Sequence, residues 1–187
     1  MPQAQSLSCA CGATQWTIHD DRKGRHLKCY CADCQTFQTH LGHADRHLEN
    51  SGVRIFQTVP SNISFTKGSE NLALLRLSPK GTFRWYLSCC NTPFSTSFPS
   101  PAVPFCGLVL PKDLNAFGPV RGHAFTETTN GRVKQSGMLA TIASFMARAL
   151  LSRIKGEDRH RPFFDADGAP VVEPHVLTLE ERNAARP

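Results

Sequence analysis

The sequence predicts a mainly β protein, a sandwich of short antiparallel strands followed by a C-terminal amphipathic helix and an extended tail. Short runs rich in β-branched and aromatic residues recur up to residue 110, and turn residues separate them. Apolar residues then recur at helical spacing between residues 138 and 154. We therefore divide the 187 residues into a β domain, residues 1–135, and a helix with its tail, residues 136–187.

Short segments with a strand pattern follow one another along the first part of the chain. Each alternates apolar and polar side chains or forms a short apolar run between turn residues, and they span residues 13–19, 25–31, 53–59, 63–66, 72–77, 83–87 and 105–110. The strand 25–31 would place Cys29 and Cys31 on one side, because side chains two apart on a strand share a face. Asn130-Gly131 predicts a further hairpin turn between residues 120 and 133.

From residue 136 the sequence predicts one helix, with Ser136 at its N-cap and Gly156 after its end. The residues at helical spacing are Met138, Leu139, Ile142, Phe145, Met146, Ala149, Leu150 and Ile154. We expect this apolar face to pack on the β domain, and a position on a membrane surface is the alternative. The polar tail 157–187 is expected to be extended and held by Phe163-Phe164 and Val176-Leu177.

Composition indicates the cellular compartment and the kinds of partner to expect. No run of about 18 apolar residues is present, so we expect no membrane partner. The first residues lack the basic and then apolar pattern of a secretory signal, so we expect a cytoplasmic protein with reduced thiols. The net charge of +6 would suit an anionic ligand, but the Lys and Arg residues are scattered. We therefore do not expect nucleic acid as a partner.

Seven of the eight cysteines fall into three clusters. The clusters are Cys9 and Cys11; Cys29, Cys31 and Cys34; and Cys89 and Cys90. Clusters of reduced cysteines indicate zinc, and a structural zinc is closed by four ligands. Seven thiolates exceed that number. Either a second zinc is held by three cysteines with one open position, or some of the cysteines are not ligands.

The middle cluster is the natural candidate for an open site, because one tight loop can direct three sulfurs toward one point. Three protein ligands and a water molecule are how catalytic zinc is held. Gly12 suits a turn in which backbone amides point toward the thiolates of the first pair. Cys106 lies alone in an apolar run, so we expect a small buried hydrophobic residue there.

Two residues near the middle cluster are candidates for proton transfer, Asp33 and His43. The segment 35–48 is polar and rich in histidine, and a solvated loop or helix is its ordinary interpretation. In a helix, His43 and His47 would share one face, because they lie four residues apart. The sharper hypothesis is that Asp33 or one of these histidines works beside the open zinc.

The order C-x-C-G, then C-x-C-x-x-C-Q, then a cysteine followed by x-T-P resembles the glutathione-dependent formaldehyde-activating enzyme and centromere protein V family, which has an Mss4-like β fold. Gly68, after Phe65-Thr66-Lys67, also matches that family's strand-then-glycine step. The resemblance covers roughly residues 7–110. It implies a structural zinc that joins Cys9 and Cys11 to Cys90, and a second zinc at the middle cluster.

The third motif departs from the family pattern, which is usually C-x-x-C-G-T. Aligned on Cys90, the first cysteine of the motif falls on Leu87 and its glycine falls on Asn91. Cys89 is a candidate to substitute from the neighbouring position, and Cys90 is the stronger candidate of the two. If neither closes the site, we expect the structural zinc to be weak or absent. Adjacent strand residues point to opposite faces, so both cysteines can bind one metal only if the chain bends there.

The resemblance implies an enzyme, a zinc-dependent carbon–sulfur lyase or thiol–aldehyde adduct enzyme that acts on a glutathione-type thiol conjugate. The positive net charge would suit such an anionic thiol. The alternative is a zinc-stabilised Mss4-like module that binds proteins without catalysis, since a fold does not determine a function. An enzyme needs one open zinc site in a pocket, whereas a binding module needs its zinc sites closed.

Overall fold

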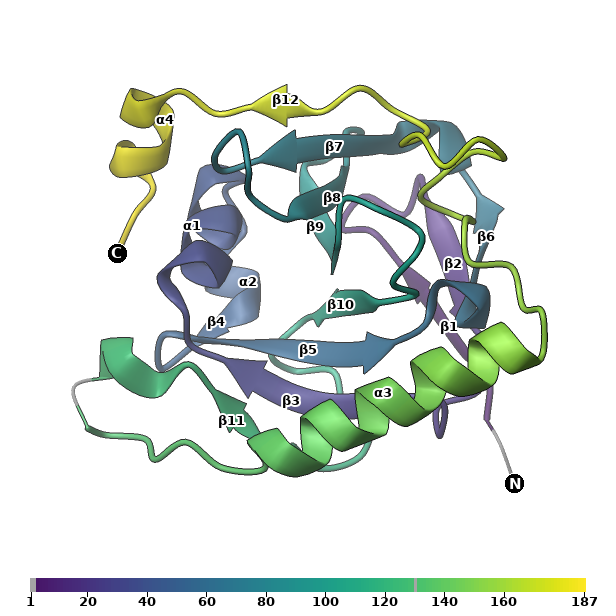
Figure 1. Ribbon diagram of the computed structural model, residues 1–187. Coiled ribbons are helices and arrows are strands. Elements are labelled where there is room, and N and C mark those ends of the chain that lie inside the picture. The colour runs from purple at the N-terminus through teal and green to yellow at the C-terminus, as the bar shows by residue number, and fades with distance from the viewer. Residues whose placement is uncertain (1–2, 130) are drawn as a thin grey trace.

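The computed structural model describes residues 3–129 and 131–187, and it confirms a mainly β fold with a C-terminal helix (Figure 1). The strands are β1 (Gln5–Ser8), β2 (Gln15–Ile18), β3 (Arg25–Cys29), β4 (Leu48–Glu49), β5 (Gly52–Thr58), β6 (Ile63–Lys67), β7 (Leu72–Arg76), β8 (Phe83–Leu87), β9 (Thr92–Ser97), β10 (Cys106–Leu110), β11 (His123–Ala124) and β12 (His175–Val176). The helices are α1 (Ala32–His40), α2 (Ala44–His47), α3 (Met138–Ile154) and α4 (Leu179–Ala184). Short 3-10 turns lie at Pro60–Asn62, Ser69–Asn71 and Thr126–Thr129.

The strands form a large sheet and a small one. The large sheet has the order β11-β3-β5-β10-β9-β8-β7-β12, with β4 paired beside β5, and the small sheet has the order β1-β2-β6. Neighbouring strands are antiparallel, except that β11 and β12 join the two edges of the large sheet in parallel. Both of these edge strands come from the part of the chain after residue 120, which therefore supplies both edges of the large sheet.

The main hydrophobic core lies between the two sheets. Trp16 and Ile18 of β2 belong to the same buried cluster as Trp85 of β8 and Phe94 of β9. Trp16 meets Phe94 edge-on, with 5.0 Å between the ring centroids. The sandwich is therefore held by burial of large aromatic side chains contributed by both sheets.

The segment between β3 and β5 is mostly helical, and α1 within it is largely buried, which corrects the expectation of a solvated segment. Phe37 of α1 is fully buried in a second hydrophobic cluster. Polar side chains enter the interior because they find partners there. Gln35 donates a hydrogen bond to the carbonyl oxygen of Tyr30 at 2.8 Å, and His47 Nδ1 lies 2.7 Å from Gln38 Oε1.

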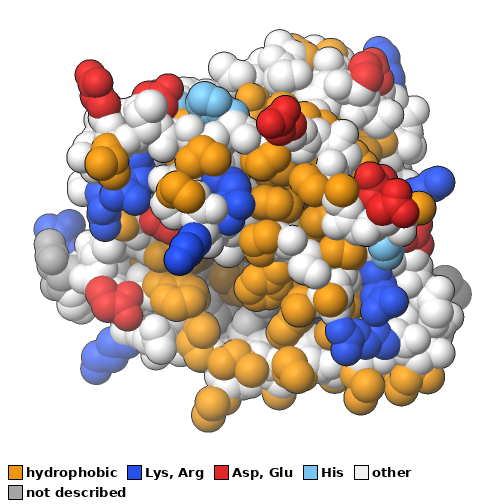
Figure 2. Space-filling model, turned by 45° about the horizontal axis from the view of Figure 1, so that its top comes forward, with side chains coloured by type: hydrophobic (Ala, Val, Ile, Leu, Met, Phe, Trp, Pro, Cys, Tyr) orange, Lys and Arg blue, Asp and Glu red, His pale blue; other side chains and the backbone are white. Residues whose placement is uncertain are grey.

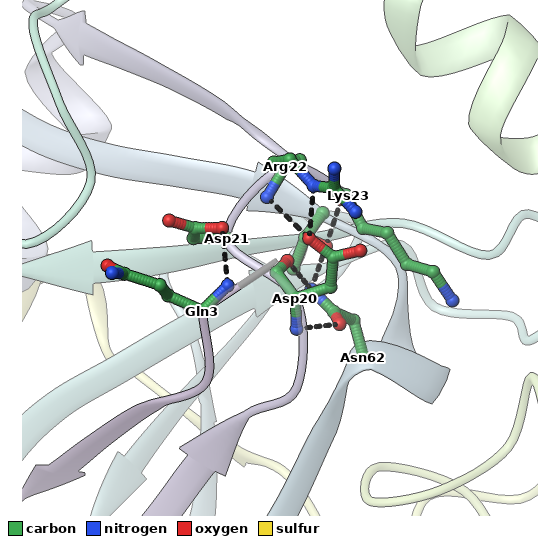
Figure 3. Close-up of polar contacts among 7 residues, drawn as sticks. Gln3, Asp20, Asp21, Arg22, Lys23 and Asn62 are labelled. Carbon is green, nitrogen blue, oxygen red and sulfur yellow. Dashed lines mark hydrogen bonds and ion pairs between the residues drawn. The ribbon is translucent and has the colours of Figure 1, made fainter. Parts of the chain in front are cut away.

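The polar turn between β2 and β3 is fixed by side chains that bond to the backbone (Figure 3). Asp20 Oδ1 accepts a hydrogen bond from the Arg22 amide at 2.9 Å. The side chain of Asn62 accepts from the Asp20 amide at 3.0 Å and donates to its carbonyl oxygen at 2.9 Å. The Gln3 amide donates to Asp21 Oδ1 at 3.2 Å. The turn is therefore tied both to the start of the chain and to the end of the Pro60–Asn62 turn.

The helix α3 forms where it was predicted, but the expectation that its apolar face packs on the β domain is wrong. Gly137, not Ser136, is the N-cap, and Gly156 follows the end of the helix with a left-handed φ of 61°. The buried residues of α3 are Thr141 and Ser152, whereas most of its large apolar side chains are exposed. Arg25 of β3 and Gln57 of β5 form hydrogen bonds with Thr141 and Arg148, so the large sheet meets the polar side of the helix.

The C-terminal tail is anchored at Phe163, Phe164 and Leu177 as predicted, but Val176 is exposed, and α4 makes the end of the tail helical rather than extended. Phe163 and Phe164 are buried, and the Phe163 ring lies 4.9 Å from the ring of Trp85. Leu177, directly after β12, is also buried. The predicted turn at Asn130 lies outside the described residues. Within residues 3–129 and 131–187, none of the helices has the length and apolar character needed to cross a bilayer.

Candidate metal centres

The first and third cysteine clusters come together in space. Cys9 and Cys11 lie in the turn after β1, and Cys89 and Cys90 lie in the turn between β8 and β9. The four sulfur atoms all lie within 4.8 Å of one another. The structure thus brings both Cys89 and Cys90 to the same cluster as the first pair. We call this group the four-cysteine cluster.

The spacing within the four-cysteine cluster fits zinc. Four sulfurs at about 2.3 Å from a tetrahedral zinc lie about 3.8 Å from one another. The observed Sγ–Sγ distances are 3.6 Å for Cys9–Cys11, 3.7 Å for Cys9–Cys89, 3.6 Å for Cys11–Cys89 and 3.8 Å for Cys89–Cys90. A disulfide would require about 2.05 Å, and all four thiols are free. The donor set is therefore that of a closed structural zinc site.

Sharp turns on both sides bring these four cysteines together. Gly12 has a φ of 75°, and Asn91 has a φ of 54°, a left-handed conformation that Gly and Asn adopt most readily. The first turn directs the Thr14 amide toward Cys9 Sγ at 3.3 Å, as predicted for this segment. In the second turn, the Cys90 amide donates to the Leu87 carbonyl oxygen at 3.3 Å. The chain leaves the strand there, so adjacent cysteines no longer point to opposite faces.

A threonine links the two halves of the four-cysteine cluster. Thr92 Oγ1 accepts a hydrogen bond from the Ala10 amide at 3.0 Å and lies 3.0 Å from Cys90 Sγ. Burial raises the pKa of the Cys90 thiol, but hydrogen bonds from Thr92 and Cys11 outweigh this effect and bring the pKa to about 6. A thiol with a lowered pKa is readily available as a thiolate, the form that binds metal.

The middle cluster gathers three cysteines where β3 passes into α1. Cys29 ends β3, Cys31 is the N-cap residue of α1, and Cys34 lies in its first turn. The Cys29 and Cys31 sulfurs lie 3.4 Å apart, and all three sulfurs lie within 4.8 Å of one another. In the described part of the chain, no fourth Cys, His, Asp or Glu donor completes this group. The three-cysteine cluster therefore has the donor set of a zinc site with one position left open.

Arg84 of β8 lies against the three-cysteine cluster, and sequence reasoning missed it. Its guanidinium Nη1 lies 3.8 Å from Cys34 Sγ, and its Nη2 lies 3.7 Å from Asp33 Oδ2. The same guanidinium lies over the Phe37 ring, 5.5 Å from its centroid. Hydrogen bonds from Cys29 and Cys31, together with the charge of Arg84, hold the pKa of Cys34 well below its usual range. An arginine inside a strand predicted to be largely apolar was the signal that could have revealed it.

The two candidates for proton transfer lie in different surroundings. Asp33 lies in the first turn of α1 between two of the clustered cysteines, and its side chain is 64% exposed. The His43 ring lies 2.9 Å from the Cys90 carbonyl oxygen through Nε2, so this histidine contacts the loop of the four-cysteine cluster. It also stacks on His47, with 5.7 Å between the ring centroids. Asp33 is therefore the candidate that lies within the three-cysteine segment.

Cys106 is fully buried in the main core and contributes to neither cluster, as the sequence predicted. Burial raises the pKa of its thiol, which keeps it protonated. It therefore behaves as a small apolar residue. The seven remaining cysteines are those that the sequence assigned to metal binding.

Comparisons with known proteins place the chain in a family. No functionally curated protein matches it. Among solved structures, it is similar to a Rhodobacter sphaeroides protein determined in a structural genomics programme, with 17% sequence identity and a TM-score of 0.41. That match covers 65% of this chain and 100% of the other. A family model matches residues 1–175, and the chain therefore belongs to the family of unknown function DUF6151.

Proposed function

We propose that this protein is a zinc-dependent carbon–sulfur lyase or thiol–aldehyde adduct enzyme that acts on a glutathione-type thiol conjugate. One observation carries the proposal: the structure brings the cysteines into two clusters, one with four thiol groups and one with three. Four cysteines suit a closed structural zinc, and three suit a zinc with an exchangeable position. A protein that used zinc only for stability would need no open position.

The residues of the three-cysteine cluster define what the site would do. Cys29, Cys31 and Cys34 would hold the ion, which would stabilise a substrate thiol as its thiolate or polarise a carbonyl group. Three thiolates and one zinc ion carry a net charge of −1. The Arg84 guanidinium beside Cys34 offsets that charge inside the protein.

Asp33 is the proposed acid and base. Its exposed carboxylate lies 3.7 Å from Nη2 of Arg84, whose Nη1 lies 3.8 Å from Cys34 Sγ, so Arg84 connects the carboxylate to the cluster. Cleavage of a thiol–aldehyde adduct requires a proton to leave the hydroxyl group of the adduct, and formation of the adduct requires the reverse. An exposed carboxylate can exchange this proton with water between turnovers.

The low exposure of the cluster favours a second candidate, a zinc-stabilised protein-binding module. Cys29 and Cys34 are buried, and Cys31 is only half-buried. A small ligand must therefore reach the cluster from the side of Cys31 and Asp33. If the cluster admits no ligand, a scaffold role remains.

The experiment is a direct assay of adduct chemistry with zinc-loaded protein. Exchange between formaldehyde, glutathione and S-hydroxymethylglutathione is followed by NMR, with wild type compared with Asp33→Asn and with Asp45→Asn. We expect wild type and Asp45→Asn to accelerate the exchange. Asp45 is the matched control because it is an exposed aspartate on the neighbouring helix α2. Asp33→Asn should retain zinc and lose about 10²-fold or more in rate. No acceleration by a wild type that carries two zinc ions would contradict the proposed enzyme.

A further inference from the structure

The helix α3 turns its apolar side toward solvent. Its exposed large apolar side chains are between 52% and 86% accessible, and they are Leu139, Ile142, Met146, Leu150, Leu151 and Ile154. Most of them follow the spacing of one face of a helix. Figure 1 shows α3 along the lower front edge of the molecule, and Figure 2 shows hydrophobic side chains that protrude along this lower edge.

The fold holds the apolar face outward through polar contacts on the opposite side of α3. Thr141 Oγ1 accepts a hydrogen bond from Arg25 Nε of β3 at 3.0 Å. Arg148 donates to Gln57 Oε1 of β5 at 3.1 Å. Thr141 and Ser152 are buried, three turns apart on the same side of the helix. Rotation of α3 to bury its leucines would break these contacts, so the exposed face belongs to the folded state.

The apolar surface extends from the helix onto the neighbouring loop. A cavity of about 420 Å³ lies between α3 and the loop before β10, and Val103, Pro104, Phe145, Met146 and Leu150 contribute to its lining. Arg153 stands at its edge and donates a hydrogen bond to the Ala102 carbonyl oxygen. Monomeric soluble proteins rarely expose a contiguous apolar patch of this kind, and such patches mark interaction sites.

The charges of the residues around α3 favour an anionic partner for its apolar face. The sequence from residue 128 to residue 156 contains no Asp or Glu. Its basic residues are Arg132, Lys134, Arg148, Arg153 and Lys155. An apolar helix face with basic residues at both ends suits an anionic lipid surface, where leucine side chains enter the acyl boundary and cations contact the headgroups. A second copy of the chain would instead bring these like charges together.

We propose that α3 binds the protein to the surface of anionic membranes, with the helix axis parallel to the bilayer. The face formed by Leu139, Ile142, Met146, Leu150 and Ile154 enters the interface, while Arg153 and Lys155 lie among the headgroups. The sequence argued against a membrane partner because it lacks a spanning segment, but surface binding needs none. This proposal is independent of the zinc chemistry, since the residues of α3 contribute to neither cysteine cluster.

The test is sedimentation of the full-length protein with vesicles of phosphatidylcholine alone or with about 30% phosphatidylserine, a content in the range of anionic cell membranes. Leu139→Gln/Leu150→Gln removes two exposed leucines of α3. Leu179→Gln is the matched control, because Leu179 on α4 is 71% exposed. We expect binding to the phosphatidylserine vesicles, at least about tenfold weaker for the double variant and unchanged for the control. Binding should be weak on phosphatidylcholine alone.

Three outcomes would overturn the proposal. The wild type could fail to sediment with phosphatidylserine vesicles. The double variant could bind as well as the wild type, with circular dichroism showing both to be folded. Sedimentation equilibrium without lipid could show a dimer that the double variant dissociates, which would make this face an interface between copies of the chain.

Discussion

Cys11 and Cys89 lie 78 residues apart in the sequence, and their sulfur atoms lie 3.6 Å apart. Cys11 belongs to the turn between β1 and β2 of the small sheet, and Cys89 belongs to the turn between β8 and β9 of the large sheet. A metal ion at this position would therefore link the two sheets of the sandwich. Metal binding at such a site contributes directly to the free energy of folding.

Removal of this link should destabilise the protein. Cys11→Ser is expected to release one zinc and to lower the free energy of unfolding by about 3 kcal/mol or more. For a chain of this length that corresponds to a fall in Tm of about 6–12 °C, measured by calorimetry. Cys106→Ala, which replaces the buried cysteine outside the clusters, should keep every zinc ion. Equal Tm values for wild type and Cys11→Ser, with and without chelator, would exclude a stabilising metal there.

The charge beside Cys34 should tune the affinity of the three-cysteine cluster for metal. Arg84→Gln removes the guanidinium that lies 3.8 Å from Cys34 Sγ, so the thiolates lose a compensating positive charge. We expect zinc affinity at this site to fall about 10- to 100-fold, as measured by competition with a chromogenic chelator. Arg76→Gln on the adjacent strand β7 is the control and should leave affinity unchanged. An unaltered affinity in Arg84→Gln would show that Arg84 serves packing alone.

A buried histidine should make stability depend on pH. Burial, followed by the charges of His43 and Arg46, lowers the pKa of His47 from 6.5 to about 3. Below pH 6.5 the unfolded chain binds a proton that the folded chain does not, so the free energy of unfolding falls as the pH falls toward 3. The slope from this group reaches at most about 1.4 kcal/mol for each pH unit.

His47→Gln should flatten this dependence between pH 6.5 and pH 4, as measured by urea unfolding. His19→Gln is the control, because His19 is exposed and should leave the slope unchanged. The cysteines contribute equally to the pH dependence of wild type and of His47→Gln. The difference in slope between these two proteins therefore measures the contribution of His47. Parallel pH profiles for wild type and His47→Gln would contradict the assignment of a buried neutral histidine.

The C-terminal tail should contribute to stability through one aromatic side chain. Phe163 is fully buried, 4.9 Å from the Trp85 ring and 6.1 Å from the Phe94 ring. Phe163→Ala is expected to cost about 3–5 kcal/mol, because it leaves a cavity in the main core. Phe125→Ala, at a half-exposed phenylalanine, should cost less than about 1 kcal/mol by the same chemical denaturation. Similar losses in the two variants would mean that the tail is not anchored in the core.

The strands that the sequence revealed are those with a clear apolar pattern, such as β5, β8 and β10. It did not reveal β1 and β9, whose residues are largely Ser, Thr and Gln. Ser95 and Ser97 of β9 are nevertheless buried, because Trp85 donates to the Ser97 hydroxyl at 2.9 Å and Ser95 donates to the Gly107 carbonyl oxygen at 3.3 Å. Hydrogen bonds between strands satisfy these polar groups. The alternation of apolar and polar residues in the sequence does not show such hydrogen-bond partners, so it did not predict this strand.

The short cysteine motifs were recognisable because the spacing within each motif is local. Short spacing brings Cys29, Cys31 and Cys34 together, and turn residues such as Gly12 are visible in the sequence. The position of Arg84 beside Cys34 was not visible, since it depends on how β8 lies relative to α1 in the fold. The orientation of α3 was also hidden. An amphipathic pattern shows that a helix has two faces, but not which face meets the sheet.

Zinc content is the measurement that tests two separate zinc sites most directly. Protein purified without chelator is analysed for zinc per chain in wild type, Cys31→Ser and Cys106→Ala. We predict two zinc ions for wild type and Cys106→Ala, and one for Cys31→Ser, because only the three-cysteine cluster loses a ligand. A single zinc in wild type that persists in Cys31→Ser would show that the three-cysteine cluster holds no metal, and the proposed enzyme would be contradicted.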